Sequence, residues 1–226
     1  MVIGKKTMFV RTGGCDYACA WCDSAFTWNG EEKADVMTAS EVFEELISEK
    51  NQINGKLNFE HVTISGGNPA LIGEPMQELI DLLHNIGIKV GLETQGSFYK
   101  DWFLDIDDLT ISPKPPSSLM KTNWSTLDDI VQQLAASNVN YSLKVVIFND
   151  EDFEYAKYVY ERYKQYDHDF FVSVGNEDSD EQGDISPRLL RQLDWLWDKV
   201  LNDEKANGFK PLPQLHTLVY ANRRKV

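Results

Sequence analysis

The sequence is poor in cysteine, in positive charge and in long apolar runs, and each shortage excludes a class of protein. Three cysteines make an odd count, which does not fit a disulfide framework, and nothing ahead of them resembles a secretory signal. Lys and Arg total 22 against 36 Asp and Glu, and the net charge of −14 repels nucleic acid and anionic membrane surfaces. No apolar run approaches the roughly 18–20 residues that a membrane-spanning helix requires.

What remains is the composition of a globular protein. Hydrophobic residues make up 42% of the chain and aromatic residues 12%, which is typical of a protein with a packed core. A length of 226 residues fits one large domain, and we expect a single domain over residues 1–226.

All three cysteines lie close together. Cys15, Cys19 and Cys22 are spaced C-x3-C and C-x2-C. Three thiolates on one short loop can hold three irons of a four-iron, four-sulfur cluster and leave the fourth iron open for chemistry. This spacing is the signature of the radical S-adenosylmethionine enzymes. Because thiols that hold iron must stay reduced, we expect the protein in the cytoplasm.

Zinc and buried thiols are the alternatives to a cluster. A structural zinc site usually has four ligands in two paired knuckles, and the sequence has no second C-x2-C or H-x3-H pair. A fourth ligand from elsewhere remains open, although the histidines are scattered at His61, His84, His168 and His216. The cysteine spacing favours the cluster.

Apolar runs alternate with amphipathic stretches along the chain. The runs predict strands over residues 7–11, 61–65, 89–93, 109–112, 141–148 and 170–174, with helices over 41–50, 75–86, 125–136, 150–163 and 187–201. Strands interleaved with helices imply parallel β–α units. We therefore predict an α/β fold, an open, partial β/α barrel of six parallel strands of the radical S-adenosylmethionine type.

In such sheets, ligands gather where the strands end. The cysteine loop, the Gly66-Gly67 pair, the segment 93–96 and the segment 112–114 all follow predicted strands. Two adjacent glycines allow the backbone to approach a ligand closely, although many such pairs are only turns. This convergence predicts one active site.

Four side chains near these ends are candidates for binding. Trp21 is an aromatic ring where an adenine would lie, or a core aromatic beside a loop. Lys114, stiffened by prolines, is a partner for a carboxylate or ribose, or a solvated lysine. Arg11 is suited to an anionic substrate group. Ser24 offers a hard oxygen that suits magnesium.

Five blocks of sequence resemble the 7-carboxy-7-deazaguanine synthase family of that superfamily. The blocks are CDYACAWCDS (15–24), SGGNPA (65–70), ETQG (93–96), SPKPP (112–116) and PQLHT (213–217). The resemblance implies a lyase that converts 6-carboxy-5,6,7,8-tetrahydropterin to 7-carboxy-7-deazaguanine with loss of ammonia, in queuosine and deazapurine biosynthesis. A 5′-deoxyadenosyl radical is implied to take hydrogen from substrate C6 and to return it, which regenerates S-adenosylmethionine.

The same resemblance implies roles for individual residues. Cys15, Cys19 and Cys22 would hold the four-iron cluster, and Ser24 would bind a magnesium ion that also binds the substrate carboxylate. S-adenosylmethionine would contact Trp21, Asp23, Gly67, Gly96, Ser112 and Lys114. The pterin would contact Arg11, Thr94, Gln214 and His216. No residue is implied as an acid or base, since the radical arises at the cluster.

The family also implies partners, and the chain departs from it at one end. A homodimer is implied, together with an electron donor such as flavodoxin or ferredoxin. Family members carry a Gln-Gly-Glu-Gly segment before the first strand, whereas this chain starts at Met1-Val-Ile-Gly4, where that segment would end. We expect that a chain without this segment assembles the cluster but binds the pterin poorly.

Two other classes stay open from the sequence. A glycyl-radical activating enzyme shares the cysteine spacing but would need a large protein partner, and it leaves the 213–217 block unexplained. A non-enzymatic iron–sulfur carrier or zinc module would not cleave S-adenosylmethionine after reduction.

Overall fold

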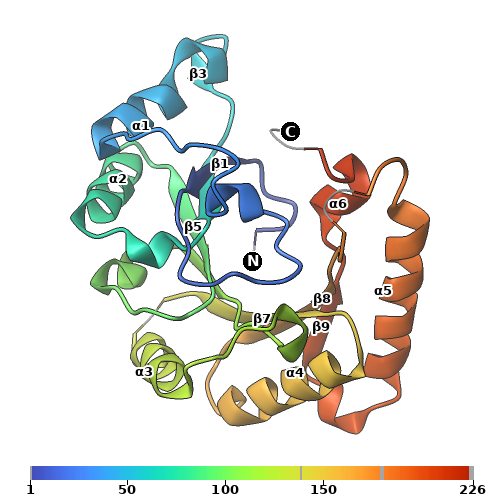
Figure 1. Ribbon diagram of the computed structural model, residues 1–226. Helices are drawn as coiled ribbons and strands as arrows, with labels where there is room; N and C mark the ends of the chain where they lie inside the picture. The colour runs from blue at the N-terminus through green and yellow to red at the C-terminus, as the bar shows by residue number, and fades with distance from the viewer. Residues whose placement is uncertain (1, 138, 179–180, 224–226) are drawn as a thin grey trace. The chain divides into compact units, whose positions relative to one another are not determined.

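The computed structural model describes residues 2–137, 139–178 and 181–223 (Figure 1). They form two compact units, which are described separately. The first unit comprises Met1–Asp16, Ser24–Ile111 and Asn123–Tyr141, and the second comprises Tyr17–Asp23, Ser112–Thr122 and Ser142–Val226. Within the described ranges, none of the helices has the length and apolar character needed to cross a bilayer.

The first unit is built on parallel strands. In spatial order these are β1 (Thr7–Thr12), β4 (His61–Gly66), β5 (Lys89–Thr94) and β6 (Asp108–Ile111). Because every pairing is parallel, the carboxyl ends of these strands lie at the same edge. Gly66 is the last residue of β4, and the segments that follow these ends include Cys15 and Gly67.

Side chains alternate between two faces of this sheet, and the faces differ in polarity. One face packs into the core and is almost completely buried: Val62, Ile64, Val90, Leu92, Leu109 and Ile111. The pairing register places polar residues on the opposite face: Thr7, His61, Thr63, Asp108 and Thr110. Of these polar residues, His61, Thr63, Asp108 and Thr110 are buried as well, and their burial does not follow from an apolar pattern.

Three helices belong to this unit, and Figure 1 shows α1 and α2 side by side. Helix α1 begins after a capping box in which the Thr38 hydroxyl accepts a hydrogen bond from Glu41 N, and the Glu41 carboxylate accepts one from Thr38 N. The remaining elements of the unit are as follows: α1 (Ala39–Ile47), α2 (Glu74–Asn85), α3 (Trp124–Ala135), the hairpin β2 (Gln52–Ile53) and β3 (Lys56–Leu57), and the 3₁₀ turns η1 (Ala25–Thr27), η2 (Glu49–Asn51), η3 (Pro69–Leu71) and η4 (Asp101–Asp105).

The second unit has three parallel strands. These are β7 (Tyr141–Ile147), whose first residue belongs to the first unit, β8 (Asp169–Val174) and β9 (Phe209–Leu212). The other elements are α4 (Asp150–Tyr163), α5 (Ser186–Leu201), α6 (Leu215–Tyr220), and the 3₁₀ turns η5 (Pro116–Ser118) and η6 (Glu204–Ala206). Strand β9 and helix α6 were not predicted from the sequence.

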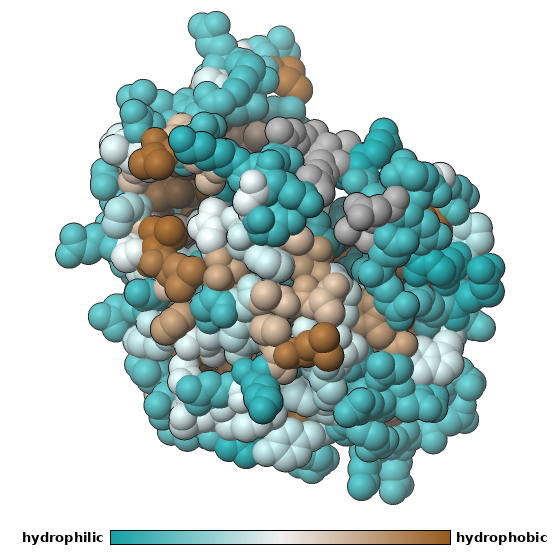
Figure 2. Space-filling view, in the orientation of Figure 1, coloured by the Kyte–Doolittle hydropathy of each residue, from teal (hydrophilic) through white to brown (hydrophobic). Residues whose placement is uncertain are grey.

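The predicted fold class is confirmed. The strands of the seven-stranded sheet follow the order β1-β4-β5-β6-β7-β8-β9, so the sheet is open, with β1 and β9 at its edges. Six strands were predicted, and β9 is the seventh. Figure 2 shows hydrophilic side chains over most of the viewed face, with hydrophobic ones in small groups.

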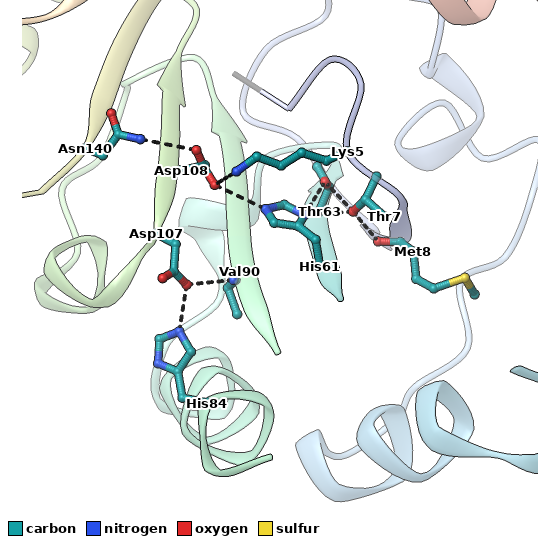
Figure 3. Close-up of polar contacts among 10 residues, drawn as sticks. All are labelled: Lys5, Thr7, Met8, His61, Thr63, His84, Val90, Asp107, Asp108 and Asn140. Carbon is teal, nitrogen blue, oxygen red and sulfur yellow. Dashed lines mark hydrogen bonds and ion pairs between the residues drawn. The ribbon is translucent and has the colours of Figure 1, made fainter. Parts of the chain in front are cut away.

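A buried polar cluster joins the beginnings of the strands in the first unit (Figure 3). Lys5 donates to the Asp108 carboxylate, and His61 Nε2 lies 3.4 Å from Asp108 Oδ2. His61 Nδ1 lies 2.9 Å from the hydroxyl of Thr7, which is 2.8 Å from that of Thr63. Burial lowers the pKa of His61, and the charge of Lys5 acts in the same direction. This polar cluster lies at the end of the strands opposite to the cysteine loop.

Candidate cofactor and substrate site

Gly67, directly after β4, packs against the loop that carries the first cysteine. Gly67 N donates to Thr12 O over 2.9 Å, and Asn68 N donates to Gly14 O over 2.9 Å. A Cβ atom at Gly67 would lie 1.8 Å from Gly14 O, which no side chain tolerates. Gly67 therefore fixes the start of the cysteine loop, whether or not it also contacts a ligand.

Asn68 is a buried hub beside this loop. Its side chain is fully buried, and its amide nitrogen donates to Asp16 Oδ1 over 2.8 Å and to Ser97 Oγ over 3.0 Å. Its amide oxygen accepts hydrogen bonds from Thr94 Oγ1 at 2.8 Å and from Ala70 N at 3.1 Å. The side chain thus joins the ends of β4 and β5 to the residue that follows Cys15.

Gln95 reaches the same loop from the end of β5. Its Nε2 lies 2.6 Å from Asp16 Oδ1 and 3.8 Å from Cys15 Sγ. Gln95 is only 6% exposed, and Cys15 is half-buried. An amide donor therefore lies within hydrogen-bond reach of one of the predicted cluster ligands.

Arg11, suited to an anionic substrate group, and Ser24, implied to bind magnesium, lie together in the first unit. Arg11 Nη1 is 3.4 Å from Ser24 Oγ, and the Arg11 guanidinium lies over the Phe9 ring, 5.5 Å from its centroid. Ser24 is buried, whereas Arg11 is exposed. A cationic group and a hydroxyl at this distance can bind one carboxylate between them.

Thr94 and Gly96 lie at the end of β5, as predicted. Thr94 is buried, and its hydroxyl is directed to Asn68. Gly96 has φ of +78°, which favours glycine, and a Cβ atom there would lie 2.7 Å from Ile111 Cγ2. The chain therefore needs glycine at this position for its own packing.

In the second unit, the cysteine loop lies against the turn η5. Ala20 N donates to Ser118 O over 3.0 Å. Trp21 Nε1 donates to Ser117 Oγ over 2.9 Å, and its ring lies 4.7 Å from that of Phe148, centroid to centroid. Trp21 is thus held by two contacts while remaining half-buried, which leaves part of its surface open.

Ser112 and Lys114 form a compact pair after β6. The Lys114 ammonium donates to the Ser112 carbonyl over 3.0 Å and to its hydroxyl over 3.2 Å. Ser112 is buried and Lys114 is half-buried, so Lys114 is not a freely solvated lysine. The ammonium retains a third hydrogen for another acceptor.

The C-terminal segment contributes His216 to the second unit. His216 Nε2 lies 3.6 Å from Asp23 Oδ2, and both side chains are about half exposed. Gln214 precedes α6, and its carbonyl accepts hydrogen bonds from Thr217 and Leu218. The structure thus brings together Asp23 and His216, which were predicted to bind different ligands.

The donor set fits an iron–sulfur cluster. The three cysteines are half-buried, and the first has an amide donor at its sulfur. Among the described residues, no three His, Cys, Asp or Glu side chains are arranged around one metal ion. That result concerns single ions, since each thiolate of a four-iron cluster binds a different iron.

Sequence reasoning missed three residues of this network. Asp16, Asn68 and Gln95 all lie inside the blocks that were singled out, but none was given a role in holding the loop. The available signal was their position directly after a cysteine or a strand. The direction of each side chain has no signature in the sequence.

Comparisons with known proteins show the family to which the chain belongs. Residues 9–174 match the family model of the radical SAM superfamily. The 7-carboxy-7-deazaguanine synthase of Bacillus cereus is 50% identical over 230 residues, which cover 100% of this chain and 92% of that protein. The protein of the same name from Bacillus subtilis is 53% identical over 233 residues, with 100% and 92% covered.

Solved structures agree with the fold. Streptococcus suis SuiB bound to S-adenosylmethionine superposes with a TM-score of 0.62 at 16% identity, covering 97% of this chain and 53% of that one. The structure named anSMEcpe with bound AdoMet gives a TM-score of 0.59 at 15% identity, covering 97% and 68%. At these identities the likeness concerns the fold alone.

Proposed function

The chain belongs to the 7-carboxy-7-deazaguanine synthase family of the radical SAM superfamily, and we propose that it makes 7-carboxy-7-deazaguanine from 6-carboxy-5,6,7,8-tetrahydropterin with release of ammonia. The identity of 50–53% to two synthases of that name, over the whole chain, is the observation that carries this function. The cysteine motif and the open parallel sheet agree with it.

Cys15, Cys19 and Cys22 are the proposed ligands of a four-iron, four-sulfur cluster. When bound, the cluster and S-adenosylmethionine supply the carbon radical that starts the reaction. Gly67 keeps the first cysteine close to the end of β4, and Asn68 anchors Asp16. These residues orient the cysteine loop through contacts within the protein itself.

S-adenosylmethionine is proposed to contact Trp21, Asp23, Gly67, Gly96, Ser112 and Lys114. Trp21 offers a ring that is already fixed by Ser117 and Phe148, so stacking on it costs little conformational entropy. Lys114 is likewise held at Ser112, with a hydrogen left for a ribose or carboxylate oxygen. Asp23 accepts hydrogen bonds from hydroxyl or ammonium groups.

The pterin is proposed to contact Arg11, Thr94, Gln214 and His216. The substrate carboxylate would bind between the Arg11 guanidinium and a magnesium ion held by Ser24. Arg11 Nη1 and Ser24 Oγ are neighbours in the first unit. Both groups hold the carboxylate and take no part in proton transfer. This arrangement orients the ring for the radical step.

A homodimer is proposed, with α5 as its interface. This helix exposes three large apolar side chains, Leu190 at 53%, Trp197 at 48% and Leu201 at 77%. Leu190 and Trp197 also line a shallow hollow with Leu193 and Asp194. Residues seven and eleven positions apart lie on one side of a helix, so a second copy can cover all three at once.

Further proposals concern the setting of the enzyme. A one-electron donor such as flavodoxin or ferredoxin is proposed to reduce the cluster. Thiolates that hold iron require a reducing compartment, and the cytoplasm is proposed for that reason. Residues 1–226 are proposed to act as a single functional domain.

A turnover assay tests the proposed function. Protein reconstituted with iron and sulfide without oxygen is reduced and mixed with S-adenosylmethionine, Mg²⁺ and the carboxy-tetrahydropterin. Equal amounts of 7-carboxy-7-deazaguanine and ammonia are expected. The matched control is Cys19→Ala, which should give neither product. Cleavage of S-adenosylmethionine without either product would overturn the proposed substrate.

A further inference from the structure

The side chain of Gln95 ends beside the first cluster ligand, and we propose that Gln95 is a positioning residue that donates a hydrogen bond to Cys15 Sγ and thereby raises the reduction potential of the cluster. The inference rests on the proposed function, because it assumes that Cys15 binds iron. It begins from two distances: Gln95 Nε2 lies 3.8 Å from Cys15 Sγ and 2.6 Å from Asp16 Oδ1.

The amide of Gln95 has two N–H groups, and the geometry gives each a direction. One donates to Asp16, and the other is left within reach of the sulfur. Gln95 is 6% exposed, so water competes little for this second hydrogen. The carboxylate of Asp16 thus sets the orientation of the amide relative to Cys15.

Asp16 is itself fixed from a second side. Asn68, which is fully buried, donates to the same carboxylate oxygen over 2.8 Å, and its own oxygen is held by Thr94. The network Thr94–Asn68–Asp16–Gln95 therefore begins at the last residue of β5 and ends at the residue directly after it. A rotation of the Gln95 amide would break its hydrogen bond to Asp16 and leave a buried donor without that partner, which is unfavourable.

A hydrogen bond to a cluster sulfur stabilises the reduced state, which carries one more negative charge. Hydrogen bonds to the sulfurs and nearby charges are recognised determinants of cluster potential. Gln95 therefore acts to raise the potential, whereas the negative charge of Asp16 acts to lower it. Removing one or the other should shift the potential in opposite directions, and this difference in sign separates electrostatic tuning from general damage to the loop.

The test measures the midpoint potential of the reconstituted cluster by electron paramagnetic resonance during a redox titration. Gln95→Met removes the donor while nearly keeping the side-chain volume, and Gln95→Asn keeps the amide on a shorter side chain. Gln77→Met is the matched control, because the Gln77 amide also donates to carboxylates, those of Asp81 and Asp105, on helix α2 and the turn η4. Asp16→Asn removes the negative charge but keeps an oxygen that can accept from Gln95 Nε2, and it tests the opposite sign.

Both Gln95 variants should shift the midpoint potential in the negative direction. At the wild-type midpoint the ratio of reduced to oxidised cluster should fall about fivefold, the effect of one net hydrogen bond. Asp16→Asn should shift the potential in the positive direction, and Gln77→Met should leave it unchanged. If Gln95→Met holds no cluster, the potential of Gln95→Asn decides.

A wild-type potential in the Gln95 variants would overturn the inference, as would equal negative shifts in the Gln95 and Asp16 variants. Turnover of the pterin by the wild-type protein is measured in parallel. Turnover with unshifted potentials would reject the role of Gln95 and keep the proposed function. Shifted potentials without turnover would keep the role of Gln95 and reject the proposed function.

Discussion

Arg11 Nη1 lies 3.4 Å from the hydroxyl of Ser24, so the residues proposed to hold the substrate carboxylate and the magnesium ion are in contact. Arg11 comes from β1, and Ser24 follows the last cysteine. The chain between them carries all three cysteines. A substrate bound at this pair is therefore tied to the same loop as the cluster.

Ser24→Ala should weaken the dependence of turnover on Mg²⁺ and leave cluster assembly intact. Loss of one oxygen ligand should lower kcat/KM at limiting Mg²⁺ by about five- to tenfold, with less effect at saturating Mg²⁺. A magnesium titration of the initial rate measures this. Ser40→Ala, at an exposed position on α1, is the control. An unchanged magnesium dependence in Ser24→Ala would contradict the metal role.

Asn68→Ala should destabilise the protein by at least about 2 kcal/mol. The substitution leaves the Thr94 hydroxyl and the Ala70 N–H without their buried partner, and each such loss costs on the order of 1–3 kcal/mol. Urea unfolding of the protein without cluster gives the free energy of unfolding. Asn202→Ala, at the exposed end of α5, should change it little. If both substitutions lower the free energy of unfolding equally, the buried hydrogen bonds of Asn68 add no more stability than those of the exposed Asn202.

The buried His61 should make the protein less stable in mild acid. Its pKa is lowered by burial and by Lys5, against the opposing charges of Asp108 and Asp107. The unfolded chain therefore binds a proton near pH 6.5 that the folded protein binds only at lower pH. The free energy of unfolding should fall as the pH drops below 6.5 and should level off below the folded-state pKa.

His61→Gln should reduce this dependence when urea unfolding is compared at several pH values between 5 and 8. Some pH dependence of the free energy of unfolding should remain in His61→Gln, because burial also lowers the pKa of His168. His84→Gln, at a more exposed site on α2, is the control. If His61→Gln keeps the full slope of the wild-type protein, the titration of His61 does not contribute to stability.

Trp197→Glu should convert the proposed dimer to a monomer, because it places a charge in the apolar side of α5. Light scattering coupled to size-exclusion chromatography measures the mass. Tyr158→Glu on α4 is matched in exposure, since both side chains are 48% exposed, and it should leave the mass unchanged. A monomeric wild-type protein, or a dimeric Trp197→Glu variant, would exclude this interface.

The strands could be predicted from the sequence because each is a run of apolar residues bounded by turn residues. Strand β9 was missed for a physical reason. Its four residues include Pro211, which argues against a central strand, but β9 lies at the edge of the sheet, where a missing N–H is tolerated.

The site was predictable in part. Spacing alone identifies the three cysteines, and the resemblance identifies the blocks around them. Neither the spacing nor the resemblance shows in which direction a side chain points. Asn68 lies in one of these blocks without an assigned contact, and its side chain is directed into the protein, toward Asp16 and Thr94. The contacts of Gln95 depend on the same long-range packing and have no local pattern.

The central claim is that this chain uses S-adenosylmethionine to rearrange the carboxy-tetrahydropterin without consuming it. The most direct measurement supplies the reduced, reconstituted protein with excess pterin and Mg²⁺ but with less S-adenosylmethionine than pterin. The account predicts that 7-carboxy-7-deazaguanine exceeds the S-adenosylmethionine added, with most of the latter recovered. Product limited to the amount of S-adenosylmethionine consumed, or 5′-deoxyadenosine formed without product, would contradict it.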